Sequence, residues 1–152
     1  SGEVQRMSAG SGLTHSEFNA SPTKDLNLLQ IWVFPKNRNV PPSYQQKDFF
    51  SQGFKEVDNL LVSPSGIRGS ITINQDCYFR ILQNTASATF EYILNEKELG
   101  VYFFVIEGSV EINSNILKTR DALGIWKSEK FDITFCENSI VLAIEIPMML
   151  SR

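Results

Sequence analysis

Short runs of β-branched and aromatic residues fill most of the chain, and this pattern leaves little room for helices. Gly, Asn, Asp, Ser or Pro separates the runs, as is typical of β-sandwiches and β-barrels. In residues 70–74 and 88–94 apolar and polar residues alternate, which places the apolar side chains on one face of a strand. We predict strands at residues 4–7, 28–34, 59–62, 69–75, 78–83, 88–93, 102–107, 109–113, 122–126, 131–135 and 140–146.

The segments between these strands carry turn and linker signals. Gly108, flanked by Glu107 and Ser109, predicts a tight hairpin because glycine readily adopts a positive φ. Residues 113–115 form the next predicted turn. The one helical turn that we expect spans residues 44–50, and the polar, proline-rich stretch at 35–42 is typical of a linker.

Length and charge limit the classes of function. The chain has 152 residues and a net charge of -3, enough for one compact domain or for one domain and a piece of another. Its basic residues are scattered rather than clustered, so we expect no direct nucleic-acid partner. Apolar runs fall short of the ~18 residues that a membrane span needs, so we expect no membrane partner.

The start of the chain and its cysteines favour a cytoplasmic protein. Ser1 and the residues after it include neither an initiator Met nor the apolar core of a signal peptide, so we expect either that the ends were processed or that the chain starts inside a longer protein. Cys77 and Cys136 are too few for a disulfide framework. We expect both to be buried free thiols in a reducing compartment.

The single histidine restricts the possible chemistry more than any other residue. His15 is the one imidazole in the sequence, which excludes His-x-His pairs and zincin motifs. In a strand, residues two apart point to the same face, so His15 and Glu17 would present a nitrogen and an oxygen donor side by side. Such a pair is half of a ligand set suited to iron, copper, nickel or manganese, although a surface His near a surface Glu is also commonplace.

The aromatic residues allow two interpretations. They can line a ligand cavity or fill the core of a small barrel, and we favour the core because small barrels fill their interiors with side chains. The residues concerned are Phe79, Phe90, Tyr92, Tyr102, Phe104, Trp126, Phe131 and Phe135.

Residues 2–19 strongly resemble the end of the N-terminal cupin domain of pirins and pirin-like proteins. The matching pattern runs from Gly2 through a Met-Ser-Ala-Gly stretch to the His15-Ser-Glu17 triplet. Two further stretches that resemble the family lie at residues 29–33 and 41–45. The second half resembles the family's C-terminal cupin through residues 61–64, 69–70, 107–110 and 121–122.

This resemblance implies an all-β cupin fold, a double-stranded β-helix or jelly-roll barrel, preceded by remnant strands of another cupin. We expect residues 1–35 to be the tail of a truncated N-terminal cupin domain, 36–57 a linker and 58–152 the C-terminal barrel. In the family the N-terminal barrel holds one metal through three histidines and a glutamate. By that motif His15 is the third histidine and Glu17 the glutamate, and the other two histidines come from an upstream His-x-His.

The resemblance also implies the metal and the function. In the intact protein we expect iron or another divalent transition metal, with Glu17 also placed as a catalytic base; we expect this chain alone to bind none. The C-terminal barrel should hold no metal, because residues 73–78 offer Asn and Gln where a cupin would carry its His-x-His.

The resemblance leaves two functions open. One is a quercetin 2,3-dioxygenase-type oxygenase that acts on a flavonol-like small molecule. The alternative is a non-enzymatic, metal-responsive binding or regulatory protein. We expect this chain alone to be inactive, and to form a homodimer through residues 4–34, because unpaired strands invite pairing with another chain.

Overall fold

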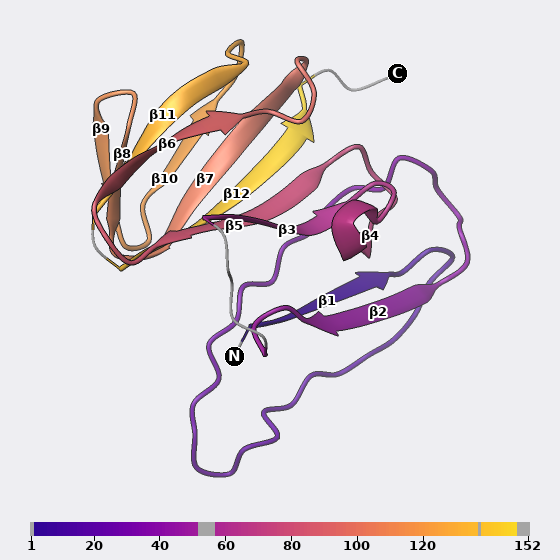
Figure 1. Cartoon of the computed structure of the whole chain (residues 1–152). Helices are drawn as coiled ribbons and strands as arrows, with labels where there is room; N and C mark the ends of the chain where they lie inside the picture. The colour runs from indigo at the N-terminus through magenta and orange to yellow at the C-terminus, as the bar shows by residue number, and fades with distance from the viewer. Residues whose placement is uncertain (1, 52–56, 137, 149–152) are drawn as a thin grey trace.

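The computed structural model describes residues 2–51, 57–136 and 138–148, and almost all of its regular structure is β-strand (Figure 1). A single turn of 3-10 helix, η1, covers Ile67–Gly69 in this part of the chain. The strands are β1 (Glu3–Ser8), β2 (Ser43–Asp48), β3 (Asp58–Ser63), β4 (Ile71–Thr72), β5 (Tyr78–Asn84), β6 (Ala88–Ile93), β7 (Leu99–Glu107), β8 (Ser109–Ile112), β9 (Asn115–Lys118), β10 (Ala122–Ile125), β11 (Lys130–Phe135) and β12 (Ser139–Pro147).

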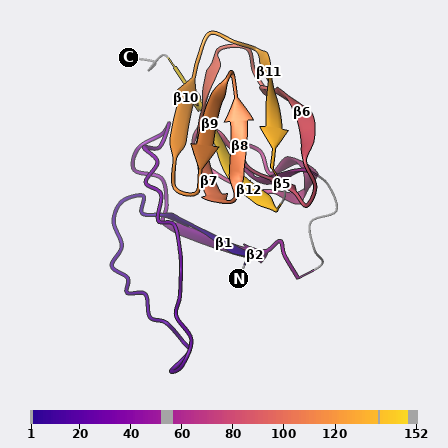
Figure 2. The same ribbon diagram turned by 90° about the vertical axis from the view of Figure 1, so that its left-hand side faces the viewer.

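Two sheets face each other to form a jelly-roll barrel. One sheet has six strands in the order β10-β7-β12-β5-β3-β4, and the other has four in the order β6-β11-β8-β9. From β5 onward the chain passes repeatedly from one sheet to the other, so that most neighbours in a sheet, apart from β8 and β9, are distant in sequence. Figure 2 shows the four-stranded sheet in front of the six-stranded one. The all-β prediction is confirmed.

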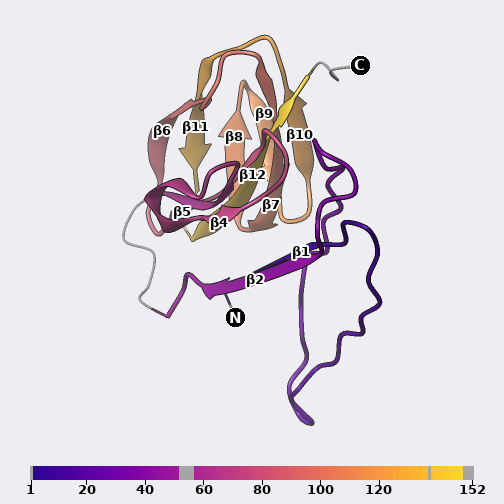
Figure 3. The same cartoon turned by 90° about the vertical axis from the view of Figure 1, so that its right-hand side faces the viewer.

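A separate two-stranded ribbon, β1 paired with β2, lies below the barrel in all three views (Figures 1, 2 and 3). The two strands are antiparallel, with Arg6 opposite Gln45. Residues 9–42, which connect them, contain no strand in the structure and make a long excursion away from the barrel (Figure 3).

The core has two parts because the six-stranded sheet is covered on both faces. Between the sheets, the apolar side chains of alternate residues form one cluster that includes Leu82, Phe103 and Val141. On the other face a second cluster forms around Phe79 and Ile81, and residues such as Val4 and Phe49 pack against it from outside the barrel. This explains why strand β5 is buried on both faces, from Tyr78 to Leu82.

Nine predicted strands are confirmed within a few residues at each end: β1, β3, β5, β6, β7, β8, β10, β11 and β12. The strand expected at 69–75 shortens to β4, and β9 was missed. The strand expected at 28–34 is wrong, because these residues have no strand partner among the described residues and most of their apolar side chains are exposed. An apolar run forms a stable strand only where another strand pairs with it.

The helical turn expected at residues 44–50 is also wrong, because this stretch forms most of strand β2. Strand β2 pairs with β1, thirty-five or more residues earlier in the chain, as in Tyr44 opposite Met7. Such pairing overrides a local helical signal, since strand stability depends on cross-strand partners.

Gly108 has the positive φ that was predicted, 78°, but the predicted hairpin is wrong. Strands β7 and β8 on its two sides belong to different sheets, so Gly108 carries the chain across the barrel. A Cβ at this position would lie 2.5 Å from Ser139 Oγ, so glycine is required by close packing as well. The predicted turn at 113–115 is confirmed, with Asn113 and Ser114 both at positive φ between β8 and β9.

Candidate functional site

His15 and Glu17 lie in the connection between β1 and β2, after two glycines with positive φ. Gly10 and Gly12 (φ 56° and 129°) turn the chain just beyond the end of β1. Both His15 and Glu17 are exposed. The expectation that they share one face of a strand is wrong, because residues 15–17 are not in a strand.

The two side chains fit half of a metal site. An imidazole nitrogen and a carboxylate oxygen are donors that suit first-row divalent metals, and exposure leaves both accessible. Within the described ranges, however, no group of three or more His, Cys, Asp and Glu residues is placed to hold a metal ion. The donor chemistry of this pair therefore fits a divalent metal, and among the described residues the pair does not belong to a larger group of such donors.

The returning part of the same connection is attached to the barrel. The backbone N–H of Lys36 donates to Asn74 O at 2.7 Å, and Gln75 Nε2 donates to Phe34 O at 2.8 Å. Lys36 Nζ also forms an ion pair with Asp76. The Asn, Gln and Asp of the 73–78 stretch therefore contact residues 34–37, which we call the strap.

The two cysteines lie in different environments. Cys77 is fully buried and directly follows the residues that contact the strap, Asn74, Gln75 and Asp76. Burial together with the nearby charge of Asp76 raises the pKa of its thiol to about 12. Cys136 is exposed, so the expectation that both thiols are buried is wrong for Cys136. Its strand β11 ends at Phe135, which leaves the next residue outside the sheet.

Aromatic side chains fill the interior of the barrel between the two sheets. The rings of Tyr92 and Phe131 stack at 5.4 Å between centroids, and Phe103 meets both edge-on. The core interpretation is confirmed for Tyr92, Phe131 and Phe135, which are buried. It is wrong for Tyr102 and Trp126, whose side chains are exposed.

A buried carboxylate, missed by the sequence analysis, sits beside this aromatic group. Glu145 has no exposed surface, and its oxygens accept hydrogen bonds from Tyr92 Oη (2.7 Å), the Asn95 backbone N–H (2.8 Å) and Asn95 Nδ2 (2.9 Å). Arg80 Nε lies 3.6 Å from Glu145 Oε1, and Arg80 Nη1 lies 3.1 Å from Asp58 Oδ2. The signal available in the sequence was one acidic residue at an inward position of the apolar run 140–146.

In this network the buried charge of Arg80 is balanced by the carboxylates of Glu145 and Asp58. Burial, followed by the charge of Glu145, raises the pKa of Tyr92 well above its usual value, so Tyr92 stays a neutral donor. The guanidinium of Arg80 also lies over the Tyr92 ring, 5.3 Å from its centroid. Because the Glu145 carboxylate accepts three hydrogen bonds and lies beside the charge of Arg80, we interpret the network as structural.

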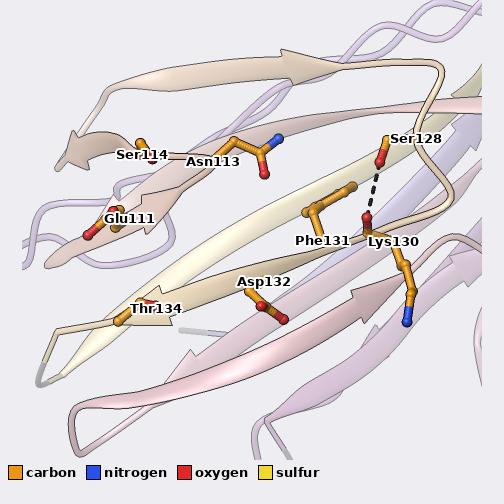
Figure 4. Close-up of a pocket in the computed structure, with 8 residues that line it drawn as sticks. All are labelled: Glu111, Asn113, Ser114, Ser128, Lys130, Phe131, Asp132 and Thr134. Atoms are coloured by element: carbon orange, nitrogen blue, oxygen red, sulfur yellow. Dashed lines mark hydrogen bonds between the residues drawn. The ribbon is translucent and has the colours of Figure 1, made fainter.

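The outer face of the four-stranded sheet bears a shallow, open depression of ≈ 410 Å³ (Figure 4). Glu111 and Asp132 lie on different strands there and do not point at a common centre, and Lys130 turns away from it. Lys130 Nζ instead pairs with Glu91 at 2.9 Å. The depression is lined by Glu111, Asn113, Ser114, Ser128, Lys130, Phe131, Asp132 and Thr134.

For the part of the chain that the structure describes, no helix is long and apolar enough to cross a membrane.

Comparison with known families accounts for both halves of the chain. Residues 60–146 match the family described as the quercetinase C-terminal cupin domain, and residues 1–33 match the family described as pirin. The quercetin 2,3-dioxygenase of Escherichia coli K12 is 35% identical over 147 residues, which are 96% of this chain and 62% of that protein. A pirin-like protein of Caulobacter vibrioides is 32% identical over 148 residues, 95% of this chain and 62% of that protein.

Solved structures agree with the sequence matches. A bacterial pirin from Escherichia coli, crystallised in complex with nickel(II), is 34% identical and superposes with a TM-score of 0.88. The match covers 97% of this chain and 62% of that one. The chain thus spans a little under two thirds of the length of these relatives. It belongs to the pirin family of cupin proteins, as a pirin-like cupin related to quercetin 2,3-dioxygenase.

Proposed function

We propose that this chain is the C-terminal part of a bicupin in which residues 1–35 complete a first barrel, 36–57 link the barrels and 58–152 form the second. His15 and Glu17 would be two ligands of a mononuclear divalent metal, iron or a similar ion, in the first barrel. The observation that supports this most is their position: both are accessible on the segment that matches the pirin family. The nickel found in the related bacterial pirin supports a divalent ion.

We infer that the whole protein is an oxygenase for a flavonol-like substrate, because its relatives are named quercetin 2,3-dioxygenases. A bound divalent metal would supply Lewis-acid and redox chemistry toward dioxygen and an enediol. Glu17 would act as the base that accepts the substrate hydroxyl proton, since its carboxylate lies two residues from His15 and is exposed.

A binding or regulatory role is the second candidate, and one observation favours it. The side chains of Trp32 and Phe34 are 88% and 89% exposed, beside the exposed leucines of the same stretch. Large apolar side chains grouped on a surface mark sites of contact with other macromolecules. In this role, binding of the metal would change the shape of a surface that docks a partner, and no substrate would be converted.

We expect this chain alone to lack quercetinase activity. Loss of positioning by itself lowers rates by about 10²-fold, and two ligands hold a metal weakly. Oxygen consumption with quercetin and added Fe, Mn, Ni or Cu would compare this chain with a polypeptide extended upstream through the expected His-x-His. Activity should appear only in the extended protein and disappear in its His15→Ala and Glu17→Gln variants.

Two outcomes would contradict the proposal. Equal rates in the short and extended proteins would place the active site in the C-terminal barrel. Near-stoichiometric metal in the dialysed short chain, retained in His15→Ala, would show by elemental analysis that the ligands lie elsewhere. Turnover that is absent in the extended, metal-loaded protein would favour the binding role.

A further inference from the structure

One face of the β1–β2 ribbon is attached to the barrel by polar side chains. Arg6 Nε donates to Thr72 O at 2.9 Å. Gln45 Oε1 accepts from both the backbone N–H (3.2 Å) and Oγ1 (3.1 Å) of Thr72. Two residues further along β2, Lys47 Nζ donates to Gly69 O. All three side chains lie on the same face of the ribbon, because Arg6 and Gln45 are opposite each other and Lys47 follows at a spacing of two.

Thr72 lies on the open edge of the six-stranded sheet. Strand β4 is the last in the order and, within the described residues, pairs only with β3, so no described strand lies beside its outer backbone groups. Arg6 and Gln45 satisfy the Thr72 carbonyl and amide as a neighbouring strand would. An open sheet edge that is covered in this way is protected from pairing elsewhere.

The same guanidinium also holds the ribbon together. Arg6 Nη1 donates to Ser43 Oγ at 2.6 Å and to Ser43 O at 3.2 Å. Beneath these polar contacts, Val4 and Phe49 pack against the second core cluster of the barrel. We define the joint as Arg6, Gln45 and Thr72. Its directional hydrogen bonds lie beside the apolar contacts of Val4 and Phe49, so the ribbon is held against both sliding along the barrel and separating from it.

Both ends of the connection that carries His15 and Glu17 are attached to the barrel. The joint holds its beginning through β1, which ends seven residues before His15, at Ser8. The strap at residues 34–37 holds its return through Asn74 and Gln75. The connection is thus a long loop with two fixed ends, and both attachment points lie in the stretch 72–76.

We propose that Arg6 and Gln45 are positioning residues, through which the C-terminal barrel sets the location of His15 and Glu17. This inference rests on the proposed function for the role of those two residues as ligands. It gives the C-terminal barrel a part in the metal chemistry, because the barrel serves as the rigid base from which the segment with His15 and Glu17 projects. Residues that never touch metal or substrate would then influence the geometry of the site.

The joint can be tested in this chain without metal. In Gln45→Leu, hydrogen exchange at the Thr72 amide should accelerate about fivefold to tenfold, the effect of losing one hydrogen bond. Residual dipolar couplings of β1 and β2 should no longer fit the alignment of the barrel. The variant Gln45→Glu keeps the accepting oxygen and should retain both properties. Gln5→Leu is the matched control, because Gln5 is exposed on the opposite face of the ribbon.

Arg6→Met gives a second, independent variant, with Arg38→Met as its control at an exposed position outside the joint. Unchanged couplings and exchange in both Gln45→Leu and Arg6→Met would overturn the proposal. Unperturbed barrel resonances in each variant would show that the fold is retained. A change that also appears in Gln5→Leu or Arg38→Met would likewise count against a specific joint.

A further experiment, with added Co²⁺, tests this inference separately from the proposed function. With Co²⁺ in excess, paramagnetic shifts of the barrel amides report where the ion sits, and the single histidine allows one unambiguous control, His15→Ala. Two ligands hold a metal weakly, so the excess of Co²⁺ is what populates the site during the measurement. We expect shifts that fit one ion position in the wild type, smaller averaged shifts in Gln45→Leu, and none in His15→Ala. Shifts that survive His15→Ala would refute the ligand assignment, while the exchange data would still decide the joint. Full-size shifts in Gln45→Leu would refute the positioning role.

Discussion

Glu145 shows at the scale of one residue how the barrel tolerates charge in its interior. Its carboxylate is fully buried, yet three hydrogen-bond donors and the Arg80 guanidinium surround it. Removing one member of a buried ionic network leaves the others unpaired in a medium of low dielectric constant. The network therefore contributes to stability only as a complete set.

We predict that Glu145→Leu lowers the free energy of unfolding by about 3–5 kcal/mol, because it removes one of the two carboxylates beside the buried Arg80 and the acceptor of the Tyr92 hydroxyl. Glu145→Gln should be milder, since the amide oxygen still accepts hydrogen bonds. Urea unfolding followed by Trp fluorescence would measure both. Glu98→Gln at an exposed position should change stability by less than about 0.5 kcal/mol. Equal stabilities for Glu145→Leu and the wild type would show that the network contributes nothing.

The buried thiol predicts a dependence of stability on pH. Burial raises the pKa of Cys77 from 9.0 to about 12, so the folded state keeps a proton that the unfolded state releases. Stability should be fully present below pH 9 and fall progressively toward pH 12. Burial raises the pKa of Tyr92 as well, which adds a loss in the same direction above its ordinary value of 10.0.

Urea unfolding at intervals between pH 9 and 12 would measure this loss. Cys77→Ala should make the decline shallower, and Cys136→Ala should leave it unchanged because that thiol is exposed. A thiol reagent should modify Cys136 rapidly and Cys77 only after unfolding. Equal reaction rates for the two thiols would contradict the assignment of Cys77 as buried.

At the scale of the strands, the crossing between the two sheets depends on glycine. We predict that Gly108→Ala destabilises the barrel by more than about 1 kcal/mol, because its φ is positive and its new Cβ would meet Ser139. Gly124→Ala is the matched control: it lies in β10, and a Cβ there meets nothing within 4 Å. Thermal unfolding of both variants would test this, and equal midpoints would refute it.

For the whole molecule, the ribbon and its connection leave backbone and apolar side chains uncovered. In the part of the chain that the structure describes, strands β1 and β2 pair only with each other, and Phe18, Trp32 and Phe34 are largely exposed. We propose that this segment mediates homodimer formation or strand exchange, since open edges and apolar patches favour association. Light scattering over a range of concentrations should detect a dimer that weakens in Trp32→Ser.

A monodisperse monomer at high concentration, with residues 9–42 protected from proteolysis, would contradict this proposal. Tyr44→Ser provides a control for Trp32→Ser, because it also removes an exposed aromatic ring but from within the ribbon. Dimerisation through the side chains of the connection should be sensitive to the first change and less so to the second.

Local sequence pattern determined most of the barrel and pointed to its candidate ligands. Alternating apolar residues specify a strand wherever one face is buried, as in β6 and β11, and Asn113-Ser114 specifies its turn by backbone preference alone. The single histidine and its neighbour Glu17 were visible without any structure. These features depend on residues close together in the chain.

Tertiary structure alone decided which strands pair and which polar groups are buried. The pairing of 43–48 with β1, the change of sheet at Gly108 and the exposure of 28–34 each depend on partners that are distant in sequence or missing from the described residues. Arg6, Gln45 and Thr72 look like ordinary surface residues in the sequence, and the apolar run around Glu145 does not show which donors its carboxylate meets. Their roles arise because the sheets bring remote donors and acceptors within hydrogen-bonding distance, and a local pattern does not encode that proximity.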